Sequence, residues 1–250
     1  MKKLLCCICY HHGEPQDFDV LIKNLRNIKE SYKFNVDVVI HTNTEAAKQL
    51  IHAVFDDVCI NVADDLLHPF HLAWQHRRYI QDHLGEYDVV MYVEHDMMIT
   101  GDQVDNYLEN IQHMWPDYCP ALVRYETSCN GDMVAVEAAA WSINKLKFVE
   151  LNAMYADVGL LYSACWILPT VLLQQVINNS FCTMDAPVWG IREHAASFVN
   201  YTLKKPLLLQ LMPGEMQISP LCLIHHASNK YVNLSNSCFG KTKISELLKI

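Results

Sequence analysis

The stretch from Tyr87 to Asp96 reads YDVVMYVEHD and has a strong strand pattern. Its first seven residues are almost continuously apolar, as expected of a strand covered on both faces. Two acids, Glu94 and Asp96, follow at positions i and i+2. The pattern predicts a buried strand that ends in a pair of carboxylates.

Strand-like and helix-like segments alternate before this stretch. The expected elements are a strand at 4–9, a helix at 17–28 with Asp17 as its N-cap, a strand at 36–40, a helix from about Thr44, a strand at 58–62 and a helix at 72–84 that ends at Gly85. This order predicts the α/β class, with a Rossmann-like, mostly parallel central sheet flanked by helices.

The second half of the sequence is less regular. Its expected elements are helices at 104–114, 170–176 and 191–199, strands at 121–124, 160–167 and 207–212, and a short amphipathic tail at 244–250. No repeat or linker divides the chain convincingly. We therefore expect one domain over 1–250, with a donor-binding half at about 1–100 and an acceptor-binding half at about 101–250.

Composition excludes several classes of protein. The formal net charge is −9, which argues against nucleic acid as a partner, because binding a phosphate backbone needs clustered positive charge. No apolar run approaches the roughly 20 residues of a membrane span. Cys6, Cys7 and Cys9 share one apolar run, Cys165 and Cys222 lie in others, and the ten cysteines show neither a disulfide pairing pattern nor the two ligand pairs of a zinc site, as expected in a reducing compartment. We expect a cytoplasmic protein without a transmembrane segment.

The two acids after the fourth strand are suited to a divalent cation. Ligands of parallel α/β sheets gather at the carboxyl ends of the strands. Carboxylates held there are hard oxygen ligands that suit Mn²⁺ or Mg²⁺, and such an ion neutralises charge on a leaving diphosphate. The alternative is a turn in which Glu94 and Asp96 are solvated or paired with Arg77 or Arg78. Of these two arginines, Arg77 falls on the apolar stripe of its helix, where its guanidinium could grip a phosphate; a surface charge is the other interpretation.

The layout resembles the GT-A family of nucleotide-sugar glycosyltransferases, in which an α/β half ends in an acid-x-acid metal motif near residue 100. The first acid here is Glu94, where the family has aspartate. The resemblance implies that the loop after the first strand, with His11, lines the nucleoside pocket, and that Arg77 faces the diphosphate. It also implies that a late histidine at a strand end completes the metal site and that Lys230 contacts phosphate.

His225 and His226 are the candidates for that late histidine. Alternation along a strand sends their rings to opposite faces, so at most one reaches a metal, and we favour His225. A structural, hydrogen-bonded histidine is the alternative. By the same resemblance, the catalytic base that activates the acceptor is Glu193, with Asp185 as its rival and Trp189 as a platform for a sugar. Asp185 and Glu193 could instead cap a turn and pair with Arg192.

The implied function is the metal-dependent transfer of a sugar from a nucleotide diphosphate-sugar to a glycan or lipid-linked acceptor, in glycan or surface polysaccharide synthesis. A nucleotidyltransferase is an alternative, although the glycine-rich basic loop typical of that class is missing after the first strand. A metallophosphoesterase using the Glu94–Asp96 triplet and the late histidines is another. A non-catalytic nucleotide-sugar-binding module is the third.

Overall fold

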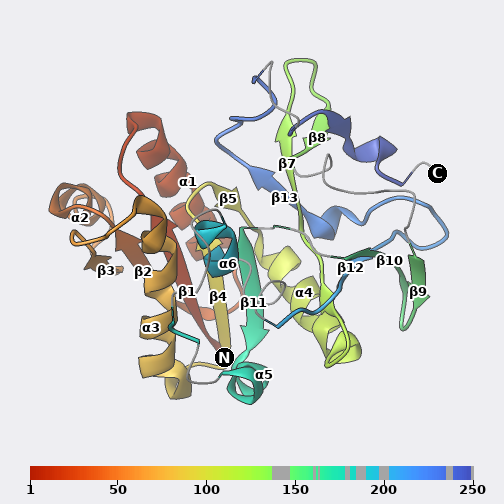
Figure 1. Cartoon of the computed structure of the whole chain (residues 1–250), viewed down its shortest axis with the longest axis horizontal. Coiled ribbons are helices and arrows are strands. Elements are labelled where there is room, and N and C mark those ends of the chain that lie inside the picture. The colour runs from red at the N-terminus through yellow and green to blue at the C-terminus, as the bar shows by residue number, and fades with distance from the viewer. Residues whose placement is uncertain are drawn as a thin grey trace. The chain divides into compact units, whose positions relative to one another are not determined.

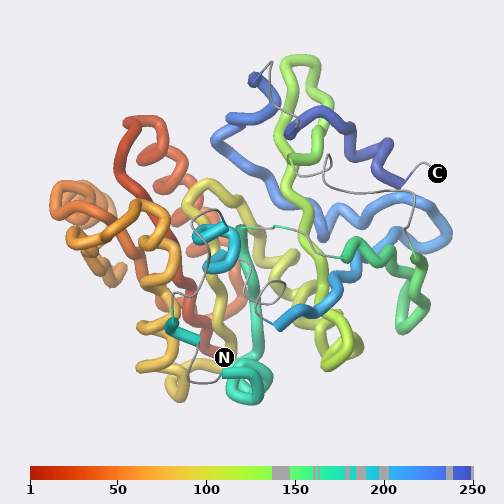
Figure 2. The backbone as a smooth tube through the Cα atoms, in the orientation of Figure 1, coloured from red at the N-terminus to blue at the C-terminus, as the bar shows by residue number. Residues whose placement is uncertain are grey.

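The computed structural model describes residues 1–136, 147–159, 162, 164–177, 181–183, 190–196, 203–234 and 239–248. The chain forms two compact units: Met1–Asp96 with Ala164–Phe198, and Met97–Ser163 with Val199–Ile250. Figure 2 traces unit 1 in red to yellow, with a return of the chain in teal and cyan. Residues 164–198, expected in the acceptor-binding half, thus lie in unit 1, and the assignment of functions to the halves stays a prediction.

Unit 1 is an alternation of strands and helices followed by the returning segment. Its elements are β1 (Lys3–Tyr10), α1 (Pro15–Ser31), β2 (Asn35–Thr42), α2 (Glu45–His52), β3 (Cys59–Val62), the 3₁₀ helix η1 (Pro69–Trp74), α3 (Gln75–His83), the 3₁₀ helix η2 (Leu84–Glu86), β4 (Val89–Glu94), β11 (Cys165–Pro169), α5 (Thr170–Val176) and α6 (Ile191–Ala196). These strands form one sheet in the order β11-β4-β1-β2-β3.

The sheet of unit 1 is parallel except at one edge. β1 pairs in parallel with β2 and β4, β2 pairs in parallel with β3, and β11 joins β4 antiparallel. Figure 1 shows β4 between β1 and β11. The expected α/β class and mostly parallel central sheet are confirmed.

Helices cover both faces of this sheet. Tyr92 of β4 stacks on His76 of α3, with ring centroids 4.0 Å apart. Its neighbour Met91 points to the other face, where its sulfur accepts a hydrogen bond from Tyr32, directly after α1. Because both faces are covered, β1 and β4 are apolar along most of their length, as the sequence indicated.

Some expected boundaries were wrong. Glu14, and not Asp17, occupies the N-cap of α1, because Pro15 fits the first helical turn; Asp17 lies inside that turn. The helix expected at 72–84 begins as the 3₁₀ helix η1, and Gly85 lies within η2. Only a 3₁₀ turn forms in the described part of the tail.

Unit 2 is built from short strands around one long helix. Its elements are β5 (Met97–Met98), α4 (Gly101–Met114), β6 (Cys119–Pro120), β7 (Val123–Thr127), β8 (Met133–Ala135), β9 (Lys147–Glu150), β10 (Met154–Gly159), β12 (Leu207–Gln210), the 3₁₀ helix η6 (Pro220–Cys222), β13 (Leu223–His226), β14 (Thr242–Lys243) and the 3₁₀ helix η7 (Ile244–Glu246). They form sheets in the orders β6-β12-β10-β9 and β14-β8-β7-β13-β5. The strand expected at 121–124 is wrong as one element, because β6 ends at Pro120 and β7 begins at Val123.

The helix α4 begins with a reciprocal cap. The Thr100 side chain accepts a hydrogen bond from the backbone N–H of Gln103, and the Gln103 side chain accepts one from the backbone of Thr100. Such a capping box contributes about 1 kcal/mol and fixes where the helix starts. β5 therefore lies between Asp96 and a firmly defined helix start.

None of the helices in the described part of the chain combines the length and the apolar character needed to cross a bilayer. Nine cysteines fall within the described residues, and all nine are free thiols.

Candidate active site

The two acids of the triplet lie at the carboxyl end of the central sheet of unit 1. Glu94 is the last residue of β4, and its neighbour in register on β1 is Cys9. Cys9 pairs in turn with His41 at the end of β2, so these three side chains share one face of the sheet. Glu94 is 7% exposed and Asp96 4%. Two carboxylates are thus held in a nearly dry place at the edge where ligands of parallel sheets gather.

His95 points away from the two acids, as its place between them in the chain predicts. Its ring meets that of Tyr10 edge-on at 5.3 Å, and its Nε2 lies 3.9 Å from Oδ1 of Asp17 in α1. Its backbone is fixed from both sides, because its N–H donates to the carbonyl of Cys9 and its carbonyl accepts from Asn24. His95 therefore anchors the triplet to α1.

Arg192 is a charged partner of this site that sequence reasoning missed. Its Nε lies 3.5 Å from Oε1 of Glu94, and its side chain is one-third exposed. Its guanidinium also lies over the ring of Phe70, 5.6 Å from the centroid. The sequence offered one signal: Arg192 stands beside Glu193 in a predicted helix, but adjacency suggested a pair with Glu193.

Two buried side chains fix the helix that carries Arg192. The indole Nε1 of Trp74 donates to the carbonyl of Ile191 at the start of α6, over 2.8 Å. At its end, Nη2 of Arg77 donates to the carbonyls of His194 and Ala195, over 2.6 and 3.4 Å. Carbonyls in the last turn of a helix lack helical partners, so Arg77 acts as a side-chain cap.

The guanidinium of Arg77 is hydrogen-bonded to backbone carbonyls. Its Nη1 donates to the carbonyl of Phe181, and its guanidinium lies 4.1 Å from the ring centroid of Trp74. Burial lowers the pKa of Arg77 to about 10, so the group stays charged at neutral pH. The alternative of a surface charge is wrong, since the side chain is 1% exposed. Contact of Arg77 with a diphosphate stays a prediction. It would require the guanidinium to give up some of its hydrogen bonds to backbone carbonyls.

The pKa of the Cys9 thiol depends on its burial and on the charges around it. Burial, and after it the charge of Glu94, raise its pKa to about 12, whereas Tyr92 and Arg192 oppose the rise. The thiol is therefore neutral at physiological pH. Cys9 lies opposite Glu94 in the sheet, at the same edge as the Glu94–Arg192 pair.

The loop with His11 is joined to the loop after β2. The Asn43 side chain accepts from the backbone N–H of His12 over 2.7 Å and lies 3.3 Å from Nε2 of His11. The ring of His12 in turn lies 2.9 Å from the hydroxyl of Tyr10. His11 is exposed. The loop is thus held in a defined shape at the same end of the sheet.

One more buried group lies near this end of the sheet. His41 is 3% exposed, and its Nε2 has no hydrogen-bond partner among the described residues. Burial lowers the pKa of His41 to about 4. Its ring faces Tyr79 of α3 edge-on at 6.1 Å. The imidazole is held neutral at physiological pH.

In unit 2 the two late histidines have different surroundings. His225 stacks on Tyr125 with centroids 5.2 Å apart, and its Nε2 is buried without a hydrogen-bond partner in the part of the chain that the structure describes. Burial and the adjacent His226 lower the pKa of His225, while Glu126 opposes the shift. A neutral imidazole nitrogen is the form that binds metals.

His226 belongs to a buried structural network. Its Nδ1 lies 2.6 Å from Oε1 of Glu126, a side chain of β7 with no exposed surface. Glu126 also accepts the backbone N–H groups of Tyr231 and Val232, over 3.1 and 2.5 Å. Burial acts to raise the pKa of Glu126, but the bonds from His226, Val232 and Tyr231 hold it below its usual value. The network ties the segment after β13 to β7.

The remaining predicted residues are scattered or fall outside the described residues. Glu193 lies in the first turn of α6 and is half-buried, and Lys230 is exposed in unit 2. Asp185 and Trp189 lie outside the described residues.

The metal-site candidates belong to different units: Glu94 and Asp96 to unit 1, His225 to unit 2. The chain continues from Asp96 directly into β5, and β5 pairs with β13, with Met98 opposite His225. Among the described residues, no three His, Cys, Asp or Glu side chains gather in an arrangement that could hold a metal ion.

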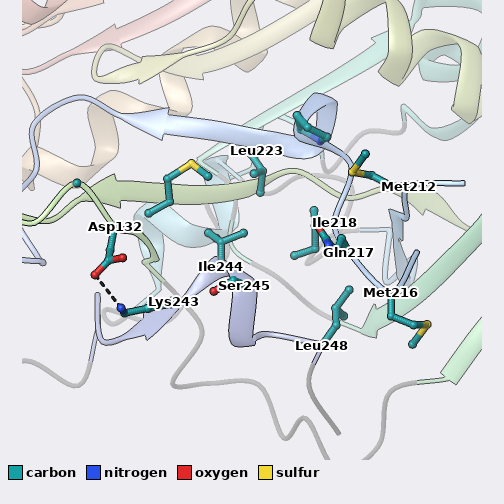
Figure 3. Close-up of a pocket in the computed structure, with 13 residues that line it drawn as sticks. Asp132, Met212, Met216, Gln217, Ile218, Leu223, Lys243, Ile244, Ser245 and Leu248 are labelled. Carbon is teal, nitrogen blue, oxygen red and sulfur yellow. Dashed lines mark ion pairs between the residues drawn. The ribbon is translucent and has the colours of Figure 1, made fainter. Parts of the chain in front are cut away.

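Unit 2 also contains a cavity of about 370 Å³. Figure 3 shows Leu223, Ile218 and Ile244 around it, with the ion pair between Asp132 and Lys243 at one end. The Asp132–Lys243 distance is 2.8 Å. A cavity of this size with a mainly apolar lining suits a small molecule that has an apolar part.

No protein-family model matches the chain, and no curated protein matches it in sequence. Among solved structures, it is similar to a mannosyltransferase from Pyrobaculum calidifontis in complex with GDP-Man and Mn²⁺, with TM-score 0.46, 12% identity and coverage of 92% of this chain. The chain spans 58% of that mannosyltransferase.

Two other solved structures are similar. One is CMP:2-keto-3-deoxy-manno-octonic acid synthetase complexed with CTP, with TM-score 0.42, 12% identity and coverage of 82% of this chain and 88% of the other. The second, from Desulfovibrio desulfuricans G20, is described as a nucleotide-diphospho-sugar transferase, with TM-score 0.43, 10% identity and coverage of 99% and 94%. At such TM-scores and identities, none of these similarities carries an argument about the activity of this chain.

Proposed function

We propose that this chain is a metal-dependent glycosyltransferase that moves a sugar from a nucleotide diphosphate-sugar to an acceptor hydroxyl. One observation carries the proposal. Two buried carboxylates, Glu94 and Asp96, stand at the carboxyl end of a parallel strand, with the cationic Arg192 beside Glu94. Anionic substrates with a bound divalent cation suit such a place, because the cation and the arginine balance both the acids and the phosphates.

Two of the candidate residues have the chemistry that a divalent cation needs. Glu94 and Asp96 supply the hard oxygen ligands that Mn²⁺ and Mg²⁺ prefer, and their burial requires a compensating positive charge. His225 is the third candidate ligand, with a buried Nε2 that has no hydrogen-bond partner among the described residues. A bound cation would stabilise charge on a leaving diphosphate as a Lewis acid.

The other site residues take the following roles in the proposal. Arg192 meets the diphosphate, with Lys230 and Arg77 as further cationic candidates. The loop of His11 binds the nucleoside. Glu193, in the turn of α6 that carries Arg192, deprotonates the acceptor hydroxyl, with Asp185 as its rival and Trp189 as a platform for a sugar.

The acceptor is assigned to unit 2. The cavity beside Leu223 and Ile218 has a mainly apolar lining with one ion pair at its end. Such a lining favours an acceptor with an apolar portion, and a lipid-linked acceptor has one. This supports a role in glycan or surface polysaccharide synthesis.

The similar mannosyltransferase is described with GDP-Man and Mn²⁺, but its TM-score is too low to support a transfer of ligands. The proposal therefore depends on the residues of this chain. Uridine, guanosine and thymidine diphosphate-sugars are all candidate donors.

The test is a calorimetric titration of nucleoside diphosphates and their sugars, with and without Mn²⁺, followed by a turnover assay. The proposal expects binding that requires Mn²⁺ and release of the nucleoside diphosphate from one donor. Formation of an activated sugar from a nucleoside triphosphate would favour a nucleotidyltransferase instead. Hydrolysis of a generic phosphate ester would favour a phosphoesterase, and binding without turnover a non-catalytic module.

A further inference from the structure

The ion pair between Arg192 and Glu94 joins the returning segment of the chain to the acidic triplet. We propose that Arg192 is an exchangeable counter-ion: it neutralises Glu94 while no divalent cation is bound, and it turns to the diphosphate of the donor once a cation takes Glu94. This inference rests on the proposed function and adds a role for a residue that is neither a metal ligand nor a base.

The pair differs from a permanent buried salt bridge. The Nε–Oε1 distance is 3.5 Å, and the Arg192 side chain is one-third exposed although Glu94 is almost fully buried. Arg77, in the same region, shows the permanent alternative, since it is 1% exposed and bonded to three backbone carbonyls. Arg192 therefore compensates a buried carboxylate while part of its side chain stays in contact with solvent.

The backbone that carries Arg192 is fixed. Trp74 holds the carbonyl of Ile191 immediately before it, and Arg77 holds those of His194 and Ala195 after it. α6 need not shift for the guanidinium to change partner, because rotation of the long side chain is enough. The helix therefore fixes the backbone position of Arg192, while the guanidinium can still rotate between partners.

Charge balance gives the exchange its direction. Among the ion pairs of the described residues, Arg192 offsets one of the two acidic charges of Glu94 and Asp96 while no cation is bound. A divalent cation offsets both, which leaves the charge of Arg192 in excess and repels it from Glu94. A diphosphate then restores the balance, and a guanidinium is well suited to bind it through paired hydrogen bonds.

The experiment measures Mn²⁺ binding and nucleotide binding separately, on the full chain, by calorimetry. In Arg192→Met, Mn²⁺ alone should bind about threefold or more tightly, because its competitor is gone. In the presence of saturating Mn²⁺, GDP or UDP, whichever the wild type binds, should bind about tenfold more weakly. Arg192→Lys keeps the charge and should lie between wild type and Arg192→Met in both titrations.

The matched control is Arg78→Met, because Arg78 is an exposed arginine of α3 paired with Asp82. It should leave both affinities unchanged. If Arg192→Met binds Mn²⁺ more weakly than wild type, Arg192 orients Glu94 and the exchange is wrong; unchanged affinities also overturn it. If wild type and Asp96→Asn both fail to bind Mn²⁺, the metal site of the proposed function fails, and the inference with it. If wild type binds and Asp96→Asn does not, the site stands, and the Arg192 variants test the exchange alone.

Discussion

Two buried glutamates, one in each unit, meet basic side chains from distant parts of the chain in contrasting ways. Glu126 in unit 2 has no exposed surface, lies 2.6 Å from His226 and accepts two backbone N–H groups. Glu94 in unit 1 lies 3.5 Å from Arg192, whose side chain is one-third exposed. Burial alone does not distinguish a functional acid from a structural one. Under the proposed function, Glu126, held by fixed backbone donors, is the structural acid, and Glu94, paired with an adjustable side chain, is the metal ligand.

The largest expected effect comes from neutralising Asp96, the acid two residues after Glu94. Asp96→Asn should lower metal-dependent donor turnover about a thousandfold, or about 4 kcal/mol, because the site loses a charge that balances the cation. The free energy of unfolding should change by less than about 1 kcal/mol. Turnover and urea unfolding check the two expectations, with the exposed Asp82→Asn as control. Full activity in Asp96→Asn would rule out the proposed site.

Glu126→Gln tests the structural side of the comparison. The charge that binds His226 and two backbone N–H groups would be lost in a dry place, so we expect about 3 to 5 kcal/mol less stability. Urea unfolding measures this, with Glu215→Gln on the surface as control. Glu94→Gln should cost much less stability than Glu126→Gln. Equal losses at the two positions would contradict the distinction between the two acids.

His41 is a buried histidine whose pKa is shifted by burial alone, so its contribution to stability should depend on pH. The unfolded chain binds a proton on His41 near pH 6.5, whereas the folded chain binds it only near pH 4. Between these values protonation favours the unfolded state, so stability falls by up to about 3 kcal/mol as pH drops from 6.5 to 4.

The measurement is urea unfolding across that pH range. His41→Gln should lose less stability on acidification than wild type, whatever its stability at pH 7. The exposed His52→Gln should follow the wild-type curve. A wild-type slope that persists in His41→Gln would show that another group titrates.

The two neighbouring arginines of α3 give the smallest contrast. Arg77→Met should cost about 2 kcal/mol, because three carbonyls that it binds would be left buried without their donor. Arg78→Met should change stability by less than about 0.5 kcal/mol, since Arg78 is an exposed partner of Asp82. Thermal unfolding compares them. Identical melting temperatures for the two variants would show that the capping of α6 by Arg77 does not stabilise the protein.

The sheet of unit 1 was predictable because its strands are apolar on both faces and alternate with helices. The apolar run from Leu4 and the apolar run that ends at Glu94 form strands that pair with each other in parallel. The pattern could not reveal that the edge strand beside β4 is β11, from residues 165–169, since register between distant segments leaves no local signal. In unit 2, strands of two to six residues are too short for a clear period, so β8 to β10 were not expected.

The position of the two acids of the candidate site was predictable, because they stand where an apolar strand ends, and Glu94 is the last residue of β4. Arg77 lies on the apolar stripe of its helix, as expected, yet its guanidinium caps a helix about 115 residues later, which no spacing encodes. Arg192 entered the sequence analysis only as an alternative partner of its neighbour Glu193, because sequence alone shows adjacency along the chain and not across the fold.

Unit 1 is assembled from two pieces of chain separated by residues 97–163, and the second piece supplies both the strand beside β4 and the arginine beside Glu94. A fragment that stops anywhere before residue 164 would therefore expose one edge of β4 and lose Arg192. Anyone who wishes to produce this half in isolation has to splice 1–96 to 164–198 through a short connector, and a simple truncation will not serve.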